Sequence, residues 1–176
     1  MIIGRLNSEK VIYQYDERGN VIEEALLDIA NKPILGEFRY HKITRKYDER
    51  GNEIEEAYFD VANKPVVCSG IYHKSIKKYD QYGNEIEKAY FDAANKPAVC
   101  NDAYHRSIKK YDEYGNEIEK TYFDAANKPI LGKEGYHKIT RKYDEYGNVV
   151  ADKEAYFGVE GLPIIVRLGN PGLRSG

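Results

Sequence analysis

The chain has 176 residues, with 27 Lys and Arg against 29 Asp and Glu, and its mean hydropathy is -0.71. The sequence contains no long apolar run, which excludes a transmembrane helix. Its formal charge of -2 argues against a protein that binds nucleic acid by neutralising phosphates. We therefore expect neither membrane nor nucleic acid as a partner. Two Cys are too few for a disulfide scaffold, and 41% hydrophobic residues are too many for a disordered chain. The unusual number is that of Tyr, which occurs 17 times.

The tyrosines follow an internal repeat. The string Tyr-Asp-x-x-Gly-Asn recurs with a period of 32 residues, beginning at Tyr15, Tyr47, Tyr79, Tyr111 and Tyr143. The strings Asn-Lys-Pro and Tyr-His recur with the same period. Such repetition predicts an array of small structural units. We divide the single array 1–176 into an N-terminal cap at 1–14, five units over 15–157, and a C-terminal cap or tail at 158–176.

Each unit is predicted to be an antiparallel β-hairpin. In the stretch Asp-Gln-Tyr-Gly-Asn at 80–84, Asp suits the first position of a type I turn and Gly suits the left-handed position that follows. This pattern predicts a three-residue loop closed by a glycine bulge. The flanking segments have the length and composition of strands. Counting outward places Tyr79 opposite Glu85 and Lys77 opposite Glu87, so that a basic strand faces an acidic one.

The connection between hairpins decides the architecture. Asn-Lys-Pro at 95–97 predicts a second turn, after which residues 98–100 form either a third short strand or a loop. Three strands would invert every second unit, so we expect two strands and a loop. The predicted fold is all-β, with tandem antiparallel hairpins side by side in an elongated twisted or spiralling sheet.

A β-solenoid is the alternative architecture, and the two cysteines discriminate between the two folds. Solenoid units would stack about 4.8 Å apart, which would bring Cys68 and Cys100 within the roughly 7 Å that a disulfide allows between α-carbons. Hairpin units lie roughly 10 Å apart, which would leave both thiols free.

The Tyr-Asp-x-x-Gly-Asn string resembles the core of the YD repeats of the Rhs class, over 15–20, 47–52, 79–84, 111–116 and 143–148. The resemblance implies β-hairpins wound into a large spiral sheet, often a shell or a stalk that carries another domain. It implies a scaffold and supplies no catalytic residues. The period here is longer than the usual unit of that family, and the Asn-Lys-Pro and Tyr-His segments are additional.

The repeated residues give no catalytic, cofactor or metal site. All four His occupy one repeat position with the same neighbours, whereas an active site needs unlike groups that converge once. We expect these histidines to pack against Tyr or Phe. The alternative is that they form a binding surface whose charge changes at about pH 6.5. The turn-tip tyrosines have no packing role, and other units carry Arg18 and Arg50 there. The candidate recognition surface consists of Tyr82, Tyr114, Tyr146, His41, His73, His105 and His137.

We therefore expect a non-enzymatic repeat scaffold for protein recognition or a structural domain, including the case in which it is part of a larger protein. The alternatives are a carbohydrate-binding module that uses tyrosine platforms, and a spacer or casing of a toxin or surface protein. The expected partner is an unknown protein, or a second copy that pairs through the sheet edges. Met1-Ile2-Ile3 is too short for a signal peptide, which favours the cytoplasm unless the chain is a fragment.

Overall fold

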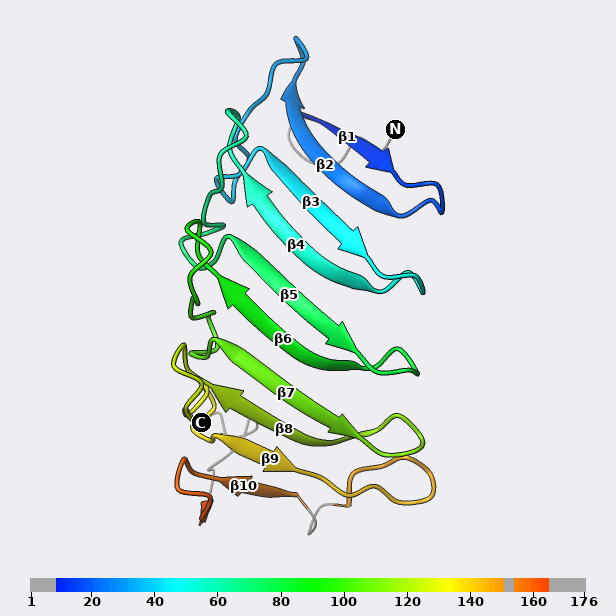
Figure 1. Ribbon diagram of the computed structural model, residues 1–176, viewed down its shortest axis with the longest axis vertical. Coiled ribbons are helices and arrows are strands. Elements are labelled where there is room, and N and C mark those ends of the chain that lie inside the picture. The colour runs from blue at the N-terminus through cyan, green and yellow to red at the C-terminus, as the bar shows by residue number, and fades with distance from the viewer. Residues whose placement is uncertain (1–8, 151–153, 165–176) are drawn as a thin grey trace, which may run out of the picture.

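The computed structural model describes residues 9–150 and 154–164, and in this part the chain forms one open sheet without helices. The sheet contains 11 strands in sequence order, each antiparallel to the next (Figure 1). The strands are β1 Glu9–Tyr15, β2 Val21–Asp28, β3 Lys42–Tyr47, β4 Glu53–Phe59, β5 Lys74–Tyr79, β6 Glu85–Phe91, β7 Arg106–Tyr111, β8 Glu117–Phe123, β9 Lys138–Thr140, β10 Ala155–Phe157 and β11 Pro163–Ile164. The predicted fold of tandem hairpins is confirmed.

The tip of each hairpin is fixed by its own Asp and Asn side chains. Asp80 Oδ1 accepts hydrogen bonds from the backbone N–H groups of Tyr82 at 2.8 Å and Asn84 at 3.0 Å. The Asn84 amide donates to Asp80 Oδ2 at 2.9 Å. Gly83 has a φ of 90°, which explains why glycine is needed there. The predicted turn is therefore present, and these bonds recur at the other tips.

The predicted register is wrong by one residue beyond the turn. Tyr79 does face Glu85, but the register then shifts, so that Lys78 faces Glu87 and Lys77 faces Lys88. The extra residue is Ile86, which forms a β-bulge. The bulge places Tyr90 opposite Ser75. There Tyr90 stacks on the tyrosines of the neighbouring hairpins. The same shift occurs in the first, second and fourth hairpins, and the first has Leu26 at the position of Tyr90, so the bulge belongs to the turn pattern that the hairpins share.

The segment between hairpins is a second turn followed by a loop. Asp92 Oδ1 accepts from the backbone N–H groups of Ala94 and Lys96, both at 2.8 Å, and Asn95 adopts a φ of 59°. A single bridge between Phe91 and Pro97 continues the ladder before the chain turns away. Two strands and a loop per unit are thus confirmed, and consecutive antiparallel pairing excludes the β-solenoid. Both cysteines are free.

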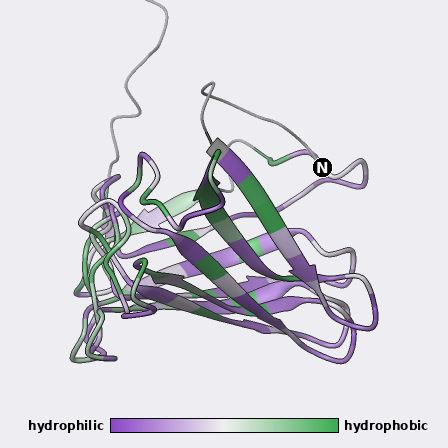
Figure 2. Ribbon diagram, turned by 90° about the horizontal axis from the view of Figure 1, so that it is seen from above, coloured by the Kyte–Doolittle hydropathy of each residue, from purple (hydrophilic) through white to green (hydrophobic). Residues whose placement is uncertain are grey.

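Loops and hairpin tips lie at opposite ends of the strands (Figures 1 and 2). The buried core lies at the loop end, where the connecting loops pack on the sheet. Its largest cluster comprises Tyr90, Cys100, Tyr104, Tyr122, Tyr136 and Ile139. The strands therefore leave much of their length, and all the tips, to solvent.

Strands occupy the described parts of the segments expected as caps. β1 begins at Glu9, so residues 9–14 belong to the strand that pairs with β2. The segment assigned to the C-terminal cap contributes β11, which pairs with β10 through Ile164 and Pro163. Residues 1–8 and 165–176 of the expected caps lie outside the described residues.

Candidate functional site

The turn-tip tyrosines form a row on the edge of the sheet that carries the hairpin tips. Tyr82, Tyr114 and Tyr146 are 79%, 83% and 81% exposed. Within the described part of the chain, their side chains make neither a hydrogen bond nor an aromatic contact. They occupy equivalent positions in successive hairpins, and two strands per unit separate equivalent residues by about 10 Å. The tips thus present three uncommitted phenol rings in a line.

The first two tips carry arginines that have a structural role. The Arg18 guanidinium donates to the carbonyl oxygen of Glu49, and the Arg50 guanidinium donates to that of Gln81. Each arginine therefore joins its own tip to the next one. The change from Arg to Tyr along the array replaces an internal contact with an exposed ring.

The four histidines lie inside the sheet and do not join the tyrosine row. Their exposed fractions are between 5% and 9%. In His41, His73 and His105, Nδ1 lies 3.2 Å from the carbonyl oxygen of the residue seven positions earlier, at the start of the connecting loop. His73 and His105 also pack edge-on against Phe59 and Phe91, with ring centroids 5.3 and 5.4 Å apart respectively. This arrangement fastens the first three connecting loops to their strands and gives these histidines an internal role. The Nδ1 atom of His137 is buried without a hydrogen-bond partner among the described residues.

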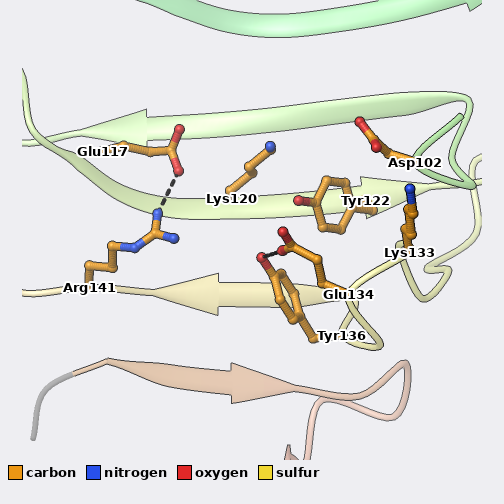
Figure 3. A pocket seen from close by; sticks show the side chains of 8 residues that line it. All are labelled: Asp102, Glu117, Lys120, Tyr122, Lys133, Glu134, Tyr136 and Arg141. Carbon is orange, nitrogen blue, oxygen red and sulfur yellow. Dashed lines mark hydrogen bonds and ion pairs between the residues drawn. The ribbon is translucent and has the colours of Figure 1, made fainter. Parts of the chain in front are cut away.

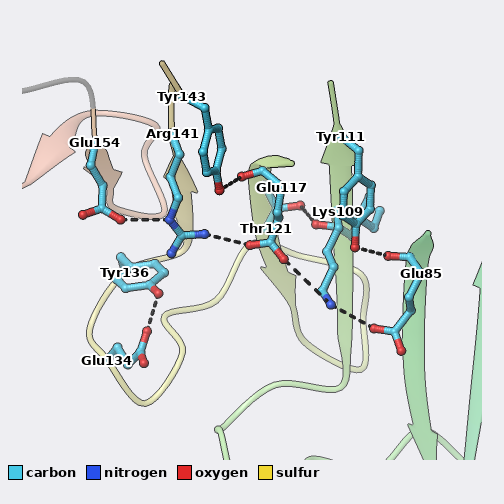
Figure 4. Close-up of polar contacts among 11 residues, drawn as sticks. Glu85, Lys109, Tyr111, Glu117, Thr121, Glu134, Tyr136, Arg141, Tyr143 and Glu154 are labelled. Carbon is cyan, nitrogen blue, oxygen red and sulfur yellow. Dashed lines mark hydrogen bonds and ion pairs between the residues drawn. The ribbon is translucent and has the colours of Figure 1, made fainter. Parts of the chain in front are cut away.

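A second set of tyrosines joins each hairpin to the preceding one. The hydroxyl of Tyr47 donates to the carbonyl oxygen of Val21 at 3.0 Å, and that of Tyr79 donates to Glu53 at 3.0 Å. Tyr111 and Tyr143 repeat this bond to Glu85 and Glu117 (Figure 4). The Tyr before each turn is therefore an inter-hairpin clamp.

The remaining repeated tyrosines stack in a ladder along the loop end of the sheet. Adjacent ring centroids are 4.6 to 6.0 Å apart, and the order is Tyr40, Tyr58, Tyr72, Tyr90, Tyr104, Tyr122, Tyr136 and Tyr156. Burial is the main cause that raises the pKa of Tyr90 well above its ordinary value. The ladder is packing, so only the tips retain exposed aromatic faces in a row.

Ion pairs also run from hairpin to hairpin on the sheet. Arg141 lies between Glu117 at 2.8 Å and Glu154 at 2.9 Å, and Lys109 lies between Glu85 at 3.1 Å and Glu117 at 3.8 Å (Figure 4). Burial lowers the pKa of Lys109, but its two carboxylate partners outweigh burial and the net pKa is raised. These charges are partners of one another, which favours a structural role.

One position breaks this pattern of pairing. It holds Glu in the first two hairpins and Lys in the next two, as Glu24, Glu56, Lys88 and Lys120. Lys88 faces Lys77 across the hairpin, and within the described residues it forms no ion pair. Burial, followed by the charge of Lys77, lowers the pKa of Lys88. The change from Glu to Lys at this position makes the charge on this side of the sheet differ between the first two hairpins and the next two.

A groove of about 530 Å³ lies beside Lys120. It is lined by Asp102, Glu117, Lys120, Tyr122, Lys133, Glu134, Tyr136 and Arg141 (Figure 3). Its tyrosines belong to the ladder, and Glu117 and Arg141 bind each other. Tyr136 donates its hydroxyl proton to Glu134. The groove thus carries three acidic and three basic side chains, of which Glu117 and Arg141 pair with each other. Sequence reasoning missed it because it arises between connecting loops of neighbouring units.

Among the described residues, no cluster of three or more His, Cys, Asp or Glu side chains could hold a metal ion. No helix in the same part of the chain is long and apolar enough to cross a membrane.

Comparisons with known proteins leave the geometry as the basis for function. No protein-family model matches the chain, and no curated protein sequence matches it significantly.

Proposed function

We propose that this chain is a non-enzymatic repeat scaffold that binds a protein partner through the row formed by Tyr82, Tyr114 and Tyr146. The single observation that carries the proposal is the exposure of these three rings, which is between 79% and 83%. Every other repeated Tyr position is used for packing or for a bond to the neighbouring hairpin. Resemblance to YD repeats, as scaffolds, points in the same direction.

The shape of the row favours a large partner over a small molecule. Small ligands are usually held in concave sites, because a cleft is needed to bury most of their surface. The row instead follows the projecting tips of the hairpins (Figure 1). A ridge of this kind fits a groove on another macromolecule. Tyrosine is enriched at protein interfaces because it buries a large area at a low cost in side-chain entropy.

The frame beneath the row is suited to recognition. Each tip is closed by bonds between Asp and Asn side chains and the backbone, and these bonds leave the Tyr side chain free. A tip of fixed shape loses little conformational freedom on binding, which improves affinity. The spacing of the three rings would then select a partner with a matching line of pockets.

The test is a triple substitution of Tyr82, Tyr114 and Tyr146 to Arg. The first two hairpins already carry Arg at this position, so the fold should accept the change. A partner is first identified by proximity labelling, and its affinity is then measured by calorimetry. We expect the triple variant to weaken binding at least tenfold, or about 1.4 kcal/mol. The control Arg18→Ala changes a tip without Tyr and removes contacts to the second tip alone, so it should leave binding unchanged.

Other outcomes separate the remaining functions. Binding on a glycan array that is lost in the same triple variant would replace the protein partner with a carbohydrate ligand. A partner that binds wild type and the triple variant equally would refute the tyrosine row as its site. A role as spacer or casing would be favoured if neither proteins nor glycans bind.

A further inference from the structure

The outer edge of β1 has the properties of an interaction surface. Among the residues that the structure describes, β1 pairs only with β2, so the backbone N–H and C=O groups of its other edge are unpaired. The strand carries large exposed side chains, with Ile12 46%, Tyr13 38% and Tyr15 58% exposed. An edge of this kind is a template for pairing with another chain.

β1 has few of the charged side chains that usually protect an edge strand from pairing with another chain. Single-chain sheets commonly place Lys on their edge strands to prevent pairing. Here the first strands of the next three hairpins, β3, β5 and β7, hold three basic residues each, at 42, 45 and 46, at 74, 77 and 78, and at 106, 109 and 110. β1 holds Lys10 alone, with Tyr13 and Gln14 at positions that are basic in the other strands. The edge strand therefore lacks the charges that the buried strands of the sheet carry.

The contacts between hairpins show what β1 is missing. At the first interior junction, Glu23, Glu24 and Ala25 of β2 pair with residues 42–44 of β3. The equivalent segment of β1 is 10–12. Tyr47 also donates its hydroxyl to β2, whereas the equivalent Tyr15 has no acceptor within the described part of the chain. An added strand would continue an interface that the described part of the array already uses four times.

We propose that β1 pairs antiparallel with β1 of a second copy, which would join two arrays into one continuous sheet. A second copy fits because a twofold axis near Val11 brings the low-charge segment 10–12 against itself. In this register Lys10 lies opposite Ile12 of the partner subunit, so no two like charges face each other. The interface is isologous and closes after two copies. It leaves the three turn-tip tyrosines free, so this inference does not depend on the proposed function.

The first experiment places like charges opposite each other across the twofold axis. Ile12 is 46% exposed, and in the proposed register Ile12→Lys would face Lys10 of the partner subunit on both sides of the axis. Sedimentation equilibrium should give a dimer for the wild-type chain, with a dissociation constant in the micromolar range. The variant should dissociate at least tenfold more readily. Gln81→Lys adds the same charge at a tip and should leave the dimer unchanged.

The second experiment tests the pairing itself. Residues that face each other in an antiparallel sheet have α-carbons about 4.5 to 5.5 Å apart, which a disulfide can bridge. With Cys68 and Cys100 replaced by Ala, Val11→Cys should form a disulfide-linked dimer on mild oxidation. Gln14→Cys in the same background is the control, because position 14 is distant from its own copy in this register.

Three results would overturn the proposal. The first is a strict monomer up to about 1 mM, where association contributes only about 4 kcal/mol. The second is a dimer that withstands the β1 charge variant and forms no link through position 11. The third is a monomer whose β1 amides are protected from hydrogen exchange, which would assign the edge to another segment of the same chain.

Discussion

Removal of one hydroxyl group tests whether the tyrosine before each turn clamps neighbouring hairpins. Tyr79 donates to the Glu53 carbonyl oxygen at 3.0 Å, and Tyr79→Phe removes this bond while it retains the ring. A hydrogen bond of this kind contributes about 1 kcal/mol net, because the unfolded chain bonds to water instead. We therefore expect Tyr79→Phe to lower the free energy of unfolding by about 1 kcal/mol, and the melting temperature by about 2 to 4 °C.

The first hairpin supplies the matched control. Tyr15 occupies the equivalent position, is 58% exposed, and has no hydroxyl acceptor within the described part of the chain. Tyr15→Phe should therefore change the free energy of unfolding by less than about 0.5 kcal/mol. Both variants are compared by urea unfolding, at protein concentrations where the chain is monomeric. Equal losses from the two variants would refute the clamp.

A multiple variant extends the same test to the array. The clamps at Tyr47, Tyr79 and Tyr111 lie in successive hairpins, about 10 Å apart, so their contributions should add. The triple Tyr→Phe variant should lose about 3 kcal/mol if each bond acts alone. Hydrogen exchange would locate the loss, because only amides near a broken clamp should open more readily if the hairpins unfold as separate units. A uniform increase across the sheet would indicate a single cooperative unit instead.

Two further predictions concern charge. Lys88→Glu introduces the residue that the first two hairpins carry as Glu24 and Glu56, and it would pair with Lys77 across the hairpin. We expect the free energy of unfolding, measured with urea, to rise by up to about 1 kcal/mol. A lower free energy of unfolding would contradict this account. At alkaline pH the buried ladder should destabilise the fold. Burial raises the pKa of Tyr58 and Tyr90, so their contribution is complete below about pH 10 and falls as pH rises beyond it, by up to about 1.4 kcal/mol per pH unit for each ring. Urea midpoints that stay constant from pH 9 to about pH 11 would rule out the effect.

The parts of the fold that could be predicted are those set by local chemistry. Asp80, Gly83 and Asn84 specify their turn through bonds and backbone angles within five residues, so the sequence was sufficient for the hairpin and its place in the unit. The register beyond the turn was wrong because outward counting assumes a regular ladder, which the bulge at Ile86 interrupts. It places Tyr90 against Tyr72 and Tyr104, which belong to other hairpins.

The candidate surface was predictable to the same degree. That Tyr82 has no packing role could be predicted because the first two tips carry Arg at the same position. Its side chain is 79% exposed, which agrees with that prediction. The groove beside Lys120 could not be foreseen, because it lies where loops of adjacent units meet. Nor could burial of the histidines be separated from a surface role by their spacing alone. It depends on the turn of each connecting loop, which brings a carbonyl oxygen to the ring.

The contacts that build the array and the residues that could bind a partner occupy separate positions in the repeat. The clamp, the ladder and the tip bonds use residues such as Tyr79, Tyr90 and Asp80, whereas the side chain of Tyr82 contacts none of them. Substitution at the tip should therefore change recognition with little cost in stability. Arg18 and Arg50 are the exception, since each joins its tip to the next. The first two hairpins thus join their tips to the next ones, and the proposed recognition falls to the other three.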